Sequence, residues 1–331
     1  MNKKVSVVIP VLNEEKNIVD LVKALYMQDY PKDRTEFIFV DGGSKDRSKD
    51  LIASECRKKD LNYRILDNPD KTAPYAFNLG IKNASGEIIV IMSAHSLYKS
   101  DYITNGVRHL AESDASNVGG YINVVGRGKI GKGIAAMQSS VFGVGATDYR
   151  LSRETKYVDT VPFGTFYRSL VDEIGYYNVE LPRNEDNECN HRIIESGRKI
   201  LLVTDMEITY FCRETIKALV ENGLANGSGV GYTAVQYPGV LSLKYFVPLA
   251  FVCSLVGLPV LYAATKNKLF KYAFVLETGA YALLDAYFSS KADTDIRTKG
   301  LMLGLFPAFH ISYGIGTVKG LIKGVRKRIS Q

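Results

Sequence analysis

Residues 5–15 read VSVVIPVLNEE, and this stretch decides the fold. Its first half, Val5–Ile9, is an almost unbroken run of β-branched residues, which is typical of a strand buried on both faces of a parallel sheet. Its second half ends in Asn13-Glu14-Glu15, where Asn13 is predicted to cap a helix and the two glutamates to occupy its first turn. A buried strand that passes directly into a helix indicates an α/β protein.

The alternation of strand and helix continues along the chain. Further strands are predicted at 36–40, 63–66, 87–92, 118–125 and 160–167, with helices at 48–56 and 73–81. This order implies a mostly parallel sheet with right-handed crossovers, in which ligands bind at the carboxyl ends of the strands. Three of these ends are followed by polar residues, namely Asn13 and Glu14, Asp41 with Gly42 and Gly43, and Ser93 with His95.

The net charge of the chain is confined to its C-terminal part. Of 42 Lys and Arg residues, eleven lie in 245–331, which holds only four of the 35 acidic residues, so this segment carries the whole formal charge of +7. The residues before it are neutral overall, which argues against a nucleic-acid partner. The four cysteines form no CxxC pair, and we therefore expect neither a zinc site nor a disulfide framework.

The same C-terminal part is apolar enough to interact with a membrane. Residues 245–265 and 300–318 contain no Asp, Glu, Lys or Arg, and each is close to the ~20 residues that span a bilayer. Residues 272–290 are also apolar but contain Glu277 and Asp285, which favours an interfacial or bundle-lining segment. The alternative is that all three are core helices of a soluble domain, but the basic residues around them favour the membrane.

Motifs along nearly the whole chain resemble the family 2 glycosyltransferases with the GT-A fold, and more closely the succinoglycan-biosynthesis group. These motifs are VVIPVLNEE at 7–15, FVDGGSKD at 39–46, NLG at 78–80, GE at 86–87, VDTVPFG at 158–164, LPRNEDNE at 181–188 and HISYGIG at 310–316. The resemblance implies a GT-A catalytic domain over 1–211, a connector or interface helix over 212–244, and a membrane-associated helical region over 245–331.

The resemblance also implies a site for a nucleotide-sugar donor at the strand ends. Asp41 matches the nucleoside-binding aspartate of the family, and a carboxylate there can accept hydrogen bonds from a uracil N–H or from ribose hydroxyls. Gly42 and Gly43 allow the backbone to approach the donor closely. The other residues expected to contact the donor are Pro10, Asn13, Glu14, Lys71, Asn78 and Ser93. The alternative roles are a turn for Asp41, a helix start for Glu14 and a solvent-exposed position for Lys71.

The metal-binding motif departs from the pattern of the family. The family has Asp-x-Asp or Asp-x-His after the fourth strand, which holds Mg²⁺ or Mn²⁺ against the diphosphate, whereas this chain has Ser93-Ala94-His95. His95 is the ordinary metal ligand that remains, and imidazole suits Mn²⁺ better than Mg²⁺. We therefore expect a divalent metal held through His95; the alternative is a structural histidine.

Glu185 and Asp186 match the acidic pair that performs base catalysis in the family. Inverting transfer needs a general base that deprotonates the acceptor hydroxyl as it attacks the anomeric carbon. The resemblance assigns this role to Asp186, with Glu185 beside it and with Arg183 and Glu188 able to orient or tune it. The alternative is an acidic first turn stabilised by the helix dipole.

These residues predict a membrane-attached inverting enzyme that moves one sugar from a nucleotide-sugar, expected to be UDP-linked, to a polyprenyl-diphosphate-linked saccharide in surface-glycan synthesis. Residues 221–229 read ENGLANGSG, so the QxxRW motif of processive synthases is absent, and the three glycines indicate a lid or flexible connector. Two alternatives stay open. One is a polyprenyl-phosphate sugar synthase, in which Arg183, Arg192 and the basic C-terminal tail could bind the lipid phosphate. The other is a non-catalytic relative that acts as a membrane scaffold.

The location of the donor restricts the membrane topology. The donor is cytosolic, so residues 1–244 are expected on the cytoplasmic side of the cell membrane, and the basic cluster at 326–328 favours the same side. Both ends on one side require an even number of crossings, whereas three apolar segments are present. Either 245–265 is re-entrant and the other two segments form a hairpin, or 272–290 lies in the interface.

Overall fold

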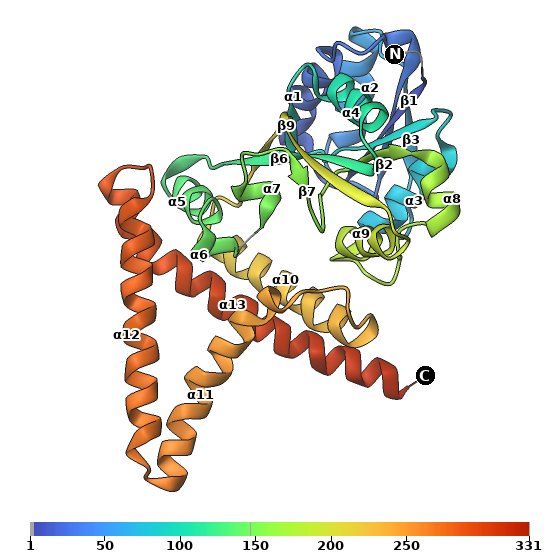
Figure 1. Ribbon diagram of the computed structural model, residues 1–331. Helices are drawn as coiled ribbons and strands as arrows, with labels where there is room; N and C mark the ends of the chain where they lie inside the picture. Colours follow the sequence, from blue (N-terminus) through green and yellow to red (C-terminus); the bar gives the residue numbers. More distant parts are fainter. Residues whose placement is uncertain (1–2, 146, 331) are drawn as a thin grey trace. The chain divides into compact units, whose positions relative to one another are not determined.

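The structure is a computed structural model that describes residues 3–145 and 147–330. It divides into two compact units (Figure 1). Unit 1 takes the chain up to Asn123 and again from Asp148 to Tyr210, and unit 2 takes Val124–Thr147 and the chain from Phe211 onward. The chain thus enters its C-terminal unit close to the predicted boundary at 211, and the three-part division remains a prediction.

Unit 1 is built on a nine-stranded sheet. The strands are β1 (Val5–Val11), β2 (Thr35–Asp41), β3 (Tyr63–Asp67), β4 (Ile88–Ile91), β5 (Ser96–Tyr98), β6 (Ala115–Val125), β7 (Lys156–Tyr157), β8 (Thr165–Tyr167) and β9 (Lys199–Phe211). Their order is β3-β2-β1-β4-β8-β6-β9-β5, with β7 paired to β9. The first four strands in this order are parallel. The pairs β4–β8, β6–β8, β5–β9 and β7–β9 are antiparallel, so the sheet is mixed.

The helices of unit 1 alternate with these strands along the chain. They are α1 (Glu15–Tyr26), the 3₁₀ turn η1 (Lys32–Arg34), α2 (Ser48–Lys58), α3 (Ala73–Asn83), α4 (Tyr102–Glu112), α7 (Asp148–Leu151), α8 (Arg168–Ile174) and α9 (Glu185–Glu195). This confirms the α/β class and the alternation that the sequence predicts. All residues of β1 except Pro10 are buried, as expected for a central parallel strand.

One predicted strand is shorter than expected. The segment 160–167 forms a strand only from Thr165, because Pro162 has no N–H for a ladder and Phe163 has a left-handed backbone with φ 52°. The residues before β8 therefore form an irregular loop. This loop lies next to β4 in the sheet, since the amide of Ile91 donates to the carbonyl of Gly164 (3.0 Å).

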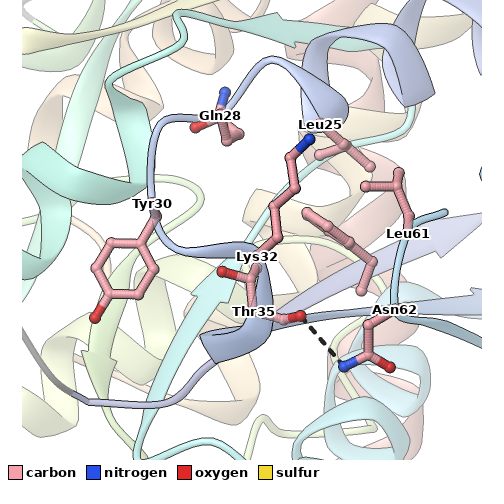
Figure 2. A pocket seen from close by; sticks show the side chains of 8 residues that line it. Leu25, Gln28, Tyr30, Lys32, Thr35, Leu61 and Asn62 are labelled. Carbon is pink, nitrogen blue, oxygen red and sulfur yellow. Dashed lines mark hydrogen bonds between the residues drawn. The ribbon is translucent and has the colours of Figure 1, made fainter. Parts of the chain in front are cut away.

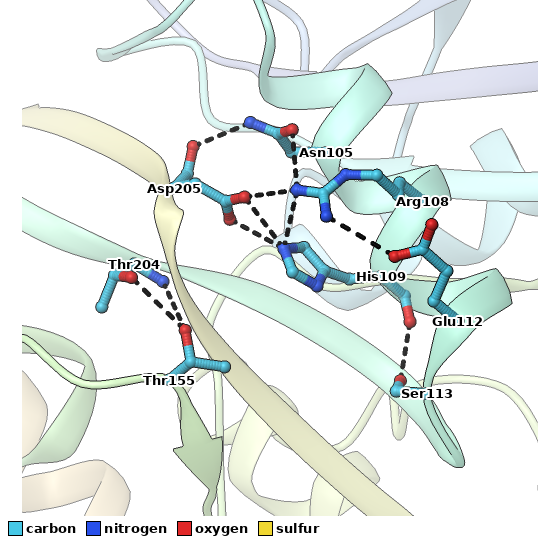
Figure 3. Close-up of polar contacts among 8 residues, drawn as sticks. All are labelled: Asn105, Arg108, His109, Glu112, Ser113, Thr155, Thr204 and Asp205. Carbon is cyan, nitrogen blue, oxygen red and sulfur yellow. Dashed lines mark hydrogen bonds and ion pairs between the residues drawn. The ribbon is translucent and has the colours of Figure 1, made fainter.

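An ion-pair network fastens the long strand β9 to α4 (Figure 3). The carboxylate of Asp205 accepts hydrogen bonds from the guanidinium of Arg108 (2.5 Å) and from Nε2 of His109 (2.9 Å). The amide of Asn105 donates to the backbone carbonyl of Asp205 (3.1 Å), and Arg108 also pairs with Glu112. These contacts fix β9 before it reaches Tyr210, a residue of the candidate site.

Unit 2 is helical. Its elements are α5 (Gly128–Gln138), α6 (Val141–Val144), α10 (Ile216–Gln236), the 3₁₀ turn η2 (Leu243–Phe246), α11 (Val247–Thr265), α12 (Lys268–Lys291) and α13 (Ile296–Ile329). In Figure 1, α10 and the C-terminal half of α13 run side by side, and α11 and α12 meet at the short turn that joins them. This turn contains Lys266, whose backbone is left-handed (φ 53°), and Asn267, whose side chain accepts from the amide of Leu269 (3.0 Å).

Glycines hold α10 and α13 in contact. A Cβ atom at Gly227 would stand 1.9 Å from the carbonyl oxygen of Tyr313, and one at Gly320 would stand 2.1 Å from that of Ser228. Both helices carry glycines four residues apart, and successive glycines face successive turns of the partner, so the two helices run parallel. Small residues at this spacing allow helix backbones to approach closely. The glycines predicted to form a lid or flexible connector, Gly223, Gly227 and Gly229, thus lie within a helix, and the expectation is wrong.

Two of the described helices are long and apolar enough to cross a membrane, Leu243–Thr265 and Ile296–Ile329. The apolar window of the first is 0% buried within the protein, whereas that of the second is 50% buried. Exposed apolar side chains occur along α11, α12 and α13, and on the first two residues such as Val256, Leu276 and Leu283 are more than half exposed. Surface of this kind is rare on soluble proteins and marks a membrane or partner contact.

The glycine contact between α10 and α13 can be tested by adding one methyl group. We expect Gly227→Ala to lower the thermal midpoint, because overpacking a close contact costs about 1–3 kcal/mol. Gly279→Ala in α12 is the matched control, since an added Cβ there meets no atom within 4 Å. Alanine is favoured over glycine in helices, so the control should melt at the same temperature or slightly higher. Equal midpoints for the two variants in detergent would contradict the close contact.

Candidate active site

The central strand brings three polar loops to one edge of the sheet. β1 lies between β2 and β4 and is parallel to both, with Val11 opposite Asp41 and Val8 opposite Ile91. The residues that follow the carboxyl ends of these strands are therefore neighbours, as the sequence predicts. Pro10 lies within β1 next to this edge, opposite Val40.

The loop after β1 is tied to the loop after β2. The backbone of Asn13 is left-handed (φ 55°), its amide donates to the hydroxyl of Ser44 (2.8 Å), and its side-chain oxygen accepts from the amide of Lys45 (2.8 Å). Asn13 is thus not the cap of α1, contrary to the expectation. Glu14 occupies the N-cap position, because the Asn13 side chain is engaged across the loops. The amide of Glu14 in turn donates to the hydroxyl of Ser48 (2.7 Å).

Asp41 shapes the loop that follows β2. Its carboxylate is 1% exposed and accepts from the amides of Gly43 (3.0 Å) and Ser44 (3.1 Å). Gly43 has φ 82°, which side-chain-bearing residues rarely adopt. Lys71 lies against the same loop, since a Cβ at Gly42 would stand 3.3 Å from the Lys71 carbonyl oxygen. Lys71 also has a left-handed backbone (φ 63°), so the structure brings it beside Asp41 and Gly43 as predicted for a common site.

Asn78 is engaged within the protein. Its side-chain amide donates to the carbonyl of Tyr177 (2.8 Å), and its side-chain oxygen accepts from the amide of the same residue (2.9 Å). Its observed role is therefore to fasten α3 to the segment before the acidic pair. The contact with the donor expected for Asn78 remains a prediction.

His95 is held by the loop after β1. Its Nδ1 lies 3.1 Å from Oε1 of Glu14 and 3.3 Å from the hydroxyl of Ser93, and its ring packs edge-on against Tyr210 with a centroid separation of 5.2 Å. Ser93 is 5% exposed, and its amide donates to the hydroxyl of Tyr98. Among residues 3–145 and 147–330, no group of three or more His, Cys, Asp and Glu side chains is placed to hold a metal ion. Within residues 93–95, His95 is therefore the one side chain of a type that ordinarily binds a metal ion.

Two further residues join this edge that sequence reasoning missed. Tyr210 lies at the end of β9 against His95, and the guanidinium of Arg150 lies 5.7 Å from the centre of the Tyr210 ring. Next to Arg150, burial raises the pKa of Tyr149, the positive charge of Arg150 lowers it and the negative charge of Asp186 raises it. Tyr149 thus lies within electrostatic range of Asp186, and its neighbour Arg150 lies over Tyr210. Neither residue belongs to a motif, so no signal in the sequence identified them.

The acidic pair opens α9. Asn184 precedes it with a left-handed backbone (φ 65°), and Glu185 and Asp186 form the first turn, where the helix dipole favours negative charge. Burial raises the pKa of Glu185 above its usual range, and the neighbouring Asp186 charge raises it further. Burial also raises the pKa of Asp186, but the amide of Asn187 donates to its Oδ1 (2.8 Å) and favours the ionised form. We therefore assign the ionised carboxylate to Asp186 and the proton to Glu185.

Of the two residues expected to tune this pair, Arg183 lowers the pKa of Glu185 through its positive charge, whereas Glu188 has a structural role. Glu188 is bound by the guanidinium of Arg192 through two hydrogen bonds of 2.8 and 2.9 Å. The same guanidinium donates to the carbonyls of Ile174, Gly175 and Tyr176. Glu188 and Arg192 therefore fasten α9 to the loop after α8, and the guanidinium of Arg192 is engaged in this structural contact.

A cavity elsewhere in unit 1 lies at the opposite end of β2 (Figure 2). Its lining includes Leu25, Gln28, Tyr30 and Thr35, and it contains no carboxylate, histidine or cysteine. The amide of Gln28 donates to the carbonyls of Ala24 and Lys99, so this polar group is engaged. The cavity is distinct from the edge where the loops meet.

Comparison with known proteins agrees with this geometry. A family model described as glycosyl transferase family 2 matches residues 6–174. The chain belongs to the family 2 glycosyltransferases. A dolichyl N-acetyl-α-D-glucosaminyl phosphate 3-β-D-2,3-diacetamido-2,3-dideoxy-β-D-glucuronosyltransferase from Methanococcus voltae is 26% identical over 97% of this chain and 98% of its own length. A succinoglycan biosynthesis protein from Rhizobium meliloti is 24% identical over 74% of each chain.

A solved glycosyltransferase shares the fold. The mannosyltransferase of Pyrobaculum calidifontis, solved in complex with GDP-Man and Mn²⁺, is 19% identical, with a TM-score of 0.65 over 98% of this chain and 88% of its own. At this level of identity the similarity concerns the fold, and it confirms the GT-A architecture with C-terminal helices. The predicted family and its succinoglycan-type group are confirmed.

The proton on Glu185 of this glycosyltransferase predicts a pH-dependent stability. An acid whose pKa is raised by folding stabilises the native state below its ordinary pKa, and that contribution is lost as the pH rises through the raised value. Glu185→Gln cannot ionise, so it should melt several degrees above the wild type at pH 9 and at nearly the same temperature at pH 4. Thermal melts across this range measure the difference. A constant difference at every pH would contradict the protonated assignment.

Proposed function

We propose that this protein is an inverting glycosyltransferase that moves a single sugar from a UDP-linked donor to a polyprenyl-linked saccharide in surface-glycan synthesis. The observation that carries the proposal is the acidic pair that opens α9, in which the partly buried Asp186 carboxylate accepts from the amide of Asn187 beside Glu185, whose pKa is raised by burial. The acceptor class is supported by the Methanococcus voltae relative, whose name specifies a dolichyl-phosphate-linked sugar and which matches over nearly its full length.

Asp186 would act as the general base. Its carboxylate takes the proton of the acceptor hydroxyl, the oxygen bonds to the anomeric carbon from the face opposite the nucleotide, and the bond to the diphosphate breaks. Attack from the opposite face inverts the anomeric centre, and the nucleoside diphosphate leaves. No covalent intermediate on the protein is needed.

The donor would bind at the strand edge. Asp41 and Gly43 form the loop proposed to receive the nucleoside, with Pro10, Asn13 and Lys71 around it. Asn78 is proposed to support the donor site from α3. A divalent metal, Mn²⁺ or Mg²⁺, would be held by Nε2 of His95 and by the donor itself, with Ser93 beside it. The imidazole is a normal Mn²⁺ ligand and its other nitrogen is already engaged, so the residues fit a metal that takes one ligand from the protein. When bound, the ion neutralises charge on the departing diphosphate.

The structure weakens the alternative of a polyprenyl-phosphate sugar synthase. That reading relied on Arg183, Arg192 and the basic C-terminal tail as cations for the lipid phosphate, and one of the three, Arg192, is bound by Glu188 and by three backbone carbonyls. A group engaged in this way has little capacity left for a phosphate. The saccharide acceptor is therefore preferred.

Asp186→Asn tests the catalytic role. We expect transfer from a nucleotide-sugar to a lipid-linked acceptor to fall by about 10²–10⁴-fold or more, because general-base catalysis contributes on this scale. UDP affinity in the presence of Mn²⁺, measured by calorimetry, should stay unchanged. Activity equal to that of the wild type would remove Asp186 as the base, and absence of any UDP binding in the wild type would favour the scaffold.

We further propose that α11 and α12 form a hairpin that crosses the cell membrane twice. The 23-residue apolar helix Leu243–Thr265, which contains α11, and the 24 residues of α12 reach about 34 and 36 Å, enough for the ~30 Å hydrocarbon core. Glu277 of α12 is paired with Ser254 of α11, which satisfies one carboxylate oxygen inside the hairpin. Two crossings leave residues 1–244 and the basic end of α13 on the cytoplasmic side, where Lys323 and Arg326 face anionic lipid.

Cysteine labelling tests this topology. In a Cys253→Ala background, Asn267→Cys at the hairpin turn should react with a membrane-impermeant maleimide in intact cells, because two crossings expose the turn outside. The matched control is Ser330→Cys at the end of α13, which should react only after permeabilisation. Protection of both positions in intact cells would indicate a re-entrant hairpin.

A further inference from the structure

The contact between Glu14 and His95 has a function that the donor-binding role expected for Glu14 does not describe. We propose that Glu14 is a positioning residue, which fixes the imidazole of His95 in the tautomer and orientation that present Nε2 to the donor diphosphate and its metal. The proposal deepens the proposed function and rests on it for the identity of the ligand. The arrangement of the imidazole itself stands on contacts within unit 1.

The chemistry of the contact assigns the proton. Nδ1 of His95 lies 3.1 Å from Oε1 of Glu14, and an ionised carboxylate can only accept hydrogen bonds. Nδ1 must therefore carry the hydrogen. The hydroxyl oxygen of Ser93, 3.3 Å from the same nitrogen, can accept a second, weaker hydrogen bond from it. In a neutral imidazole the lone pair then lies on Nε2, which makes no hydrogen bond within the described part of the chain. Nε2 is thus the nitrogen that remains to bind a ligand.

The carboxylate is itself held in place. Its other oxygen, Oε2, accepts from the side-chain amide of Asn17 (2.7 Å), and the backbone amide of Glu14 donates to the hydroxyl of Ser48 (2.7 Å). Tyr210 packs edge-on against the ring of His95 and limits its rotation. The side chains of Glu14 and His95 are 18% and 32% exposed, so the pair is shielded but His95 still reaches the surface. Both oxygens of this carboxylate already have partners. The carboxylate is therefore placed to orient the imidazole of His95 and not to bind a nucleoside.

The substitution at position 93 makes this positioning necessary. With Ser93 in place of the family's aspartate, the protein offers one strong ligand instead of two, and a single ligand cannot define its own direction. A carboxylate behind the imidazole sets its orientation, as in other carboxylate–histidine–metal arrangements, where removing the carboxylate weakens metal binding by about 10- to 100-fold. Glu14 would thus restore part of what the missing aspartate supplied.

The tautomer can be observed directly in the full chain without donor or metal. The protein has four histidines, so ¹⁵N-histidine labelling gives four imidazoles, and His95→Gln assigns the signal of His95. We expect the Nδ1–H tautomer in the wild type and its loss in Glu14→Leu. Glu14→Gln should retain it in part, because the amide oxygen can still accept from Nδ1. Glu15→Gln is the matched control, since the exposed Glu15 carboxylate accepts from the amide of Arg47 and does not touch His95.

Calorimetry provides the second measurement. When Mn²⁺ is titrated into protein saturated with UDP, the affinity for Mn²⁺ should fall about 10- to 100-fold in Glu14→Leu and less in Glu14→Gln. It should stay unchanged in Glu15→Gln. UDP binding without Mn²⁺ should be the same in all variants. Melting temperatures comparable to that of the wild type show that the variants are folded. If Glu14→Leu does not fold, Glu14→Gln still tests the proposal.

The outcomes separate this proposal from the proposed function. If Glu14→Leu and Glu14→Gln keep the wild-type tautomer and Mn²⁺ affinity, Glu14 does not position His95. If they weaken UDP binding equally with and without Mn²⁺, Glu14 contacts the nucleoside and the proposal is wrong. Failure of the wild type to bind UDP at all would overturn the proposed function, and the tautomer would still decide whether Glu14 sets the imidazole.

Discussion

The burial of β1 between two parallel partners is the constraint on which the site depends. A strand buried on both faces and hydrogen-bonded along both edges has one register, because a shift by one residue would turn every side chain to the wrong face. Val11 is therefore held opposite Asp41, and Val8 opposite Ile91. The fixed register places the loops after the three strands next to one another. Every proposed donor contact at this edge depends on that arrangement.

Backbone strain occurs in several of the loops that carry or precede the candidate site residues. Asn13, Lys71, Phe163 and Asn184 all have positive φ although none is a glycine, a conformation that costs free energy unless contacts impose it. Those contacts are visible. Asn13 is held by Ser44 and Lys45, and the amide of Lys71 donates to the carbonyl of Asn68. Such strain is characteristic of binding and catalytic loops, where the geometry serves the ligand more than the chain.

The sequence predicted what is local or repeated and missed what depends on distant partners. Strands were recognisable because buried parallel strands are continuous β-branched runs, and the acidic pair because it belongs to a motif. Asn13 was misjudged as a helix cap because its side chain binds the amide of Lys45, 32 residues away. The glycines of α10 suggested flexibility because their partners in α13 are about 90 residues further along the chain. Arg150 and Tyr210 reach the site through tertiary packing alone, which no short pattern encodes.

The altered metal motif changes the charge balance that the diphosphate would meet. An aspartate at position 93 would add a negative charge at the strand end, which binds a metal well but repels the phosphates when the metal is absent. With Ser93 there, the carboxylate beside this motif is that of Glu14, which contacts the imidazole of His95 and under the proposed function would face the donor only through it. Arg150 adds a positive charge near Tyr210, with its guanidinium 5.7 Å from the centre of that ring. Under the proposed function, a site with less negative charge and an added cation would depend less on a metal to stabilise the departing nucleotide, because electrostatic stabilisation in a partly buried site sums over all the fixed charges near the developing one.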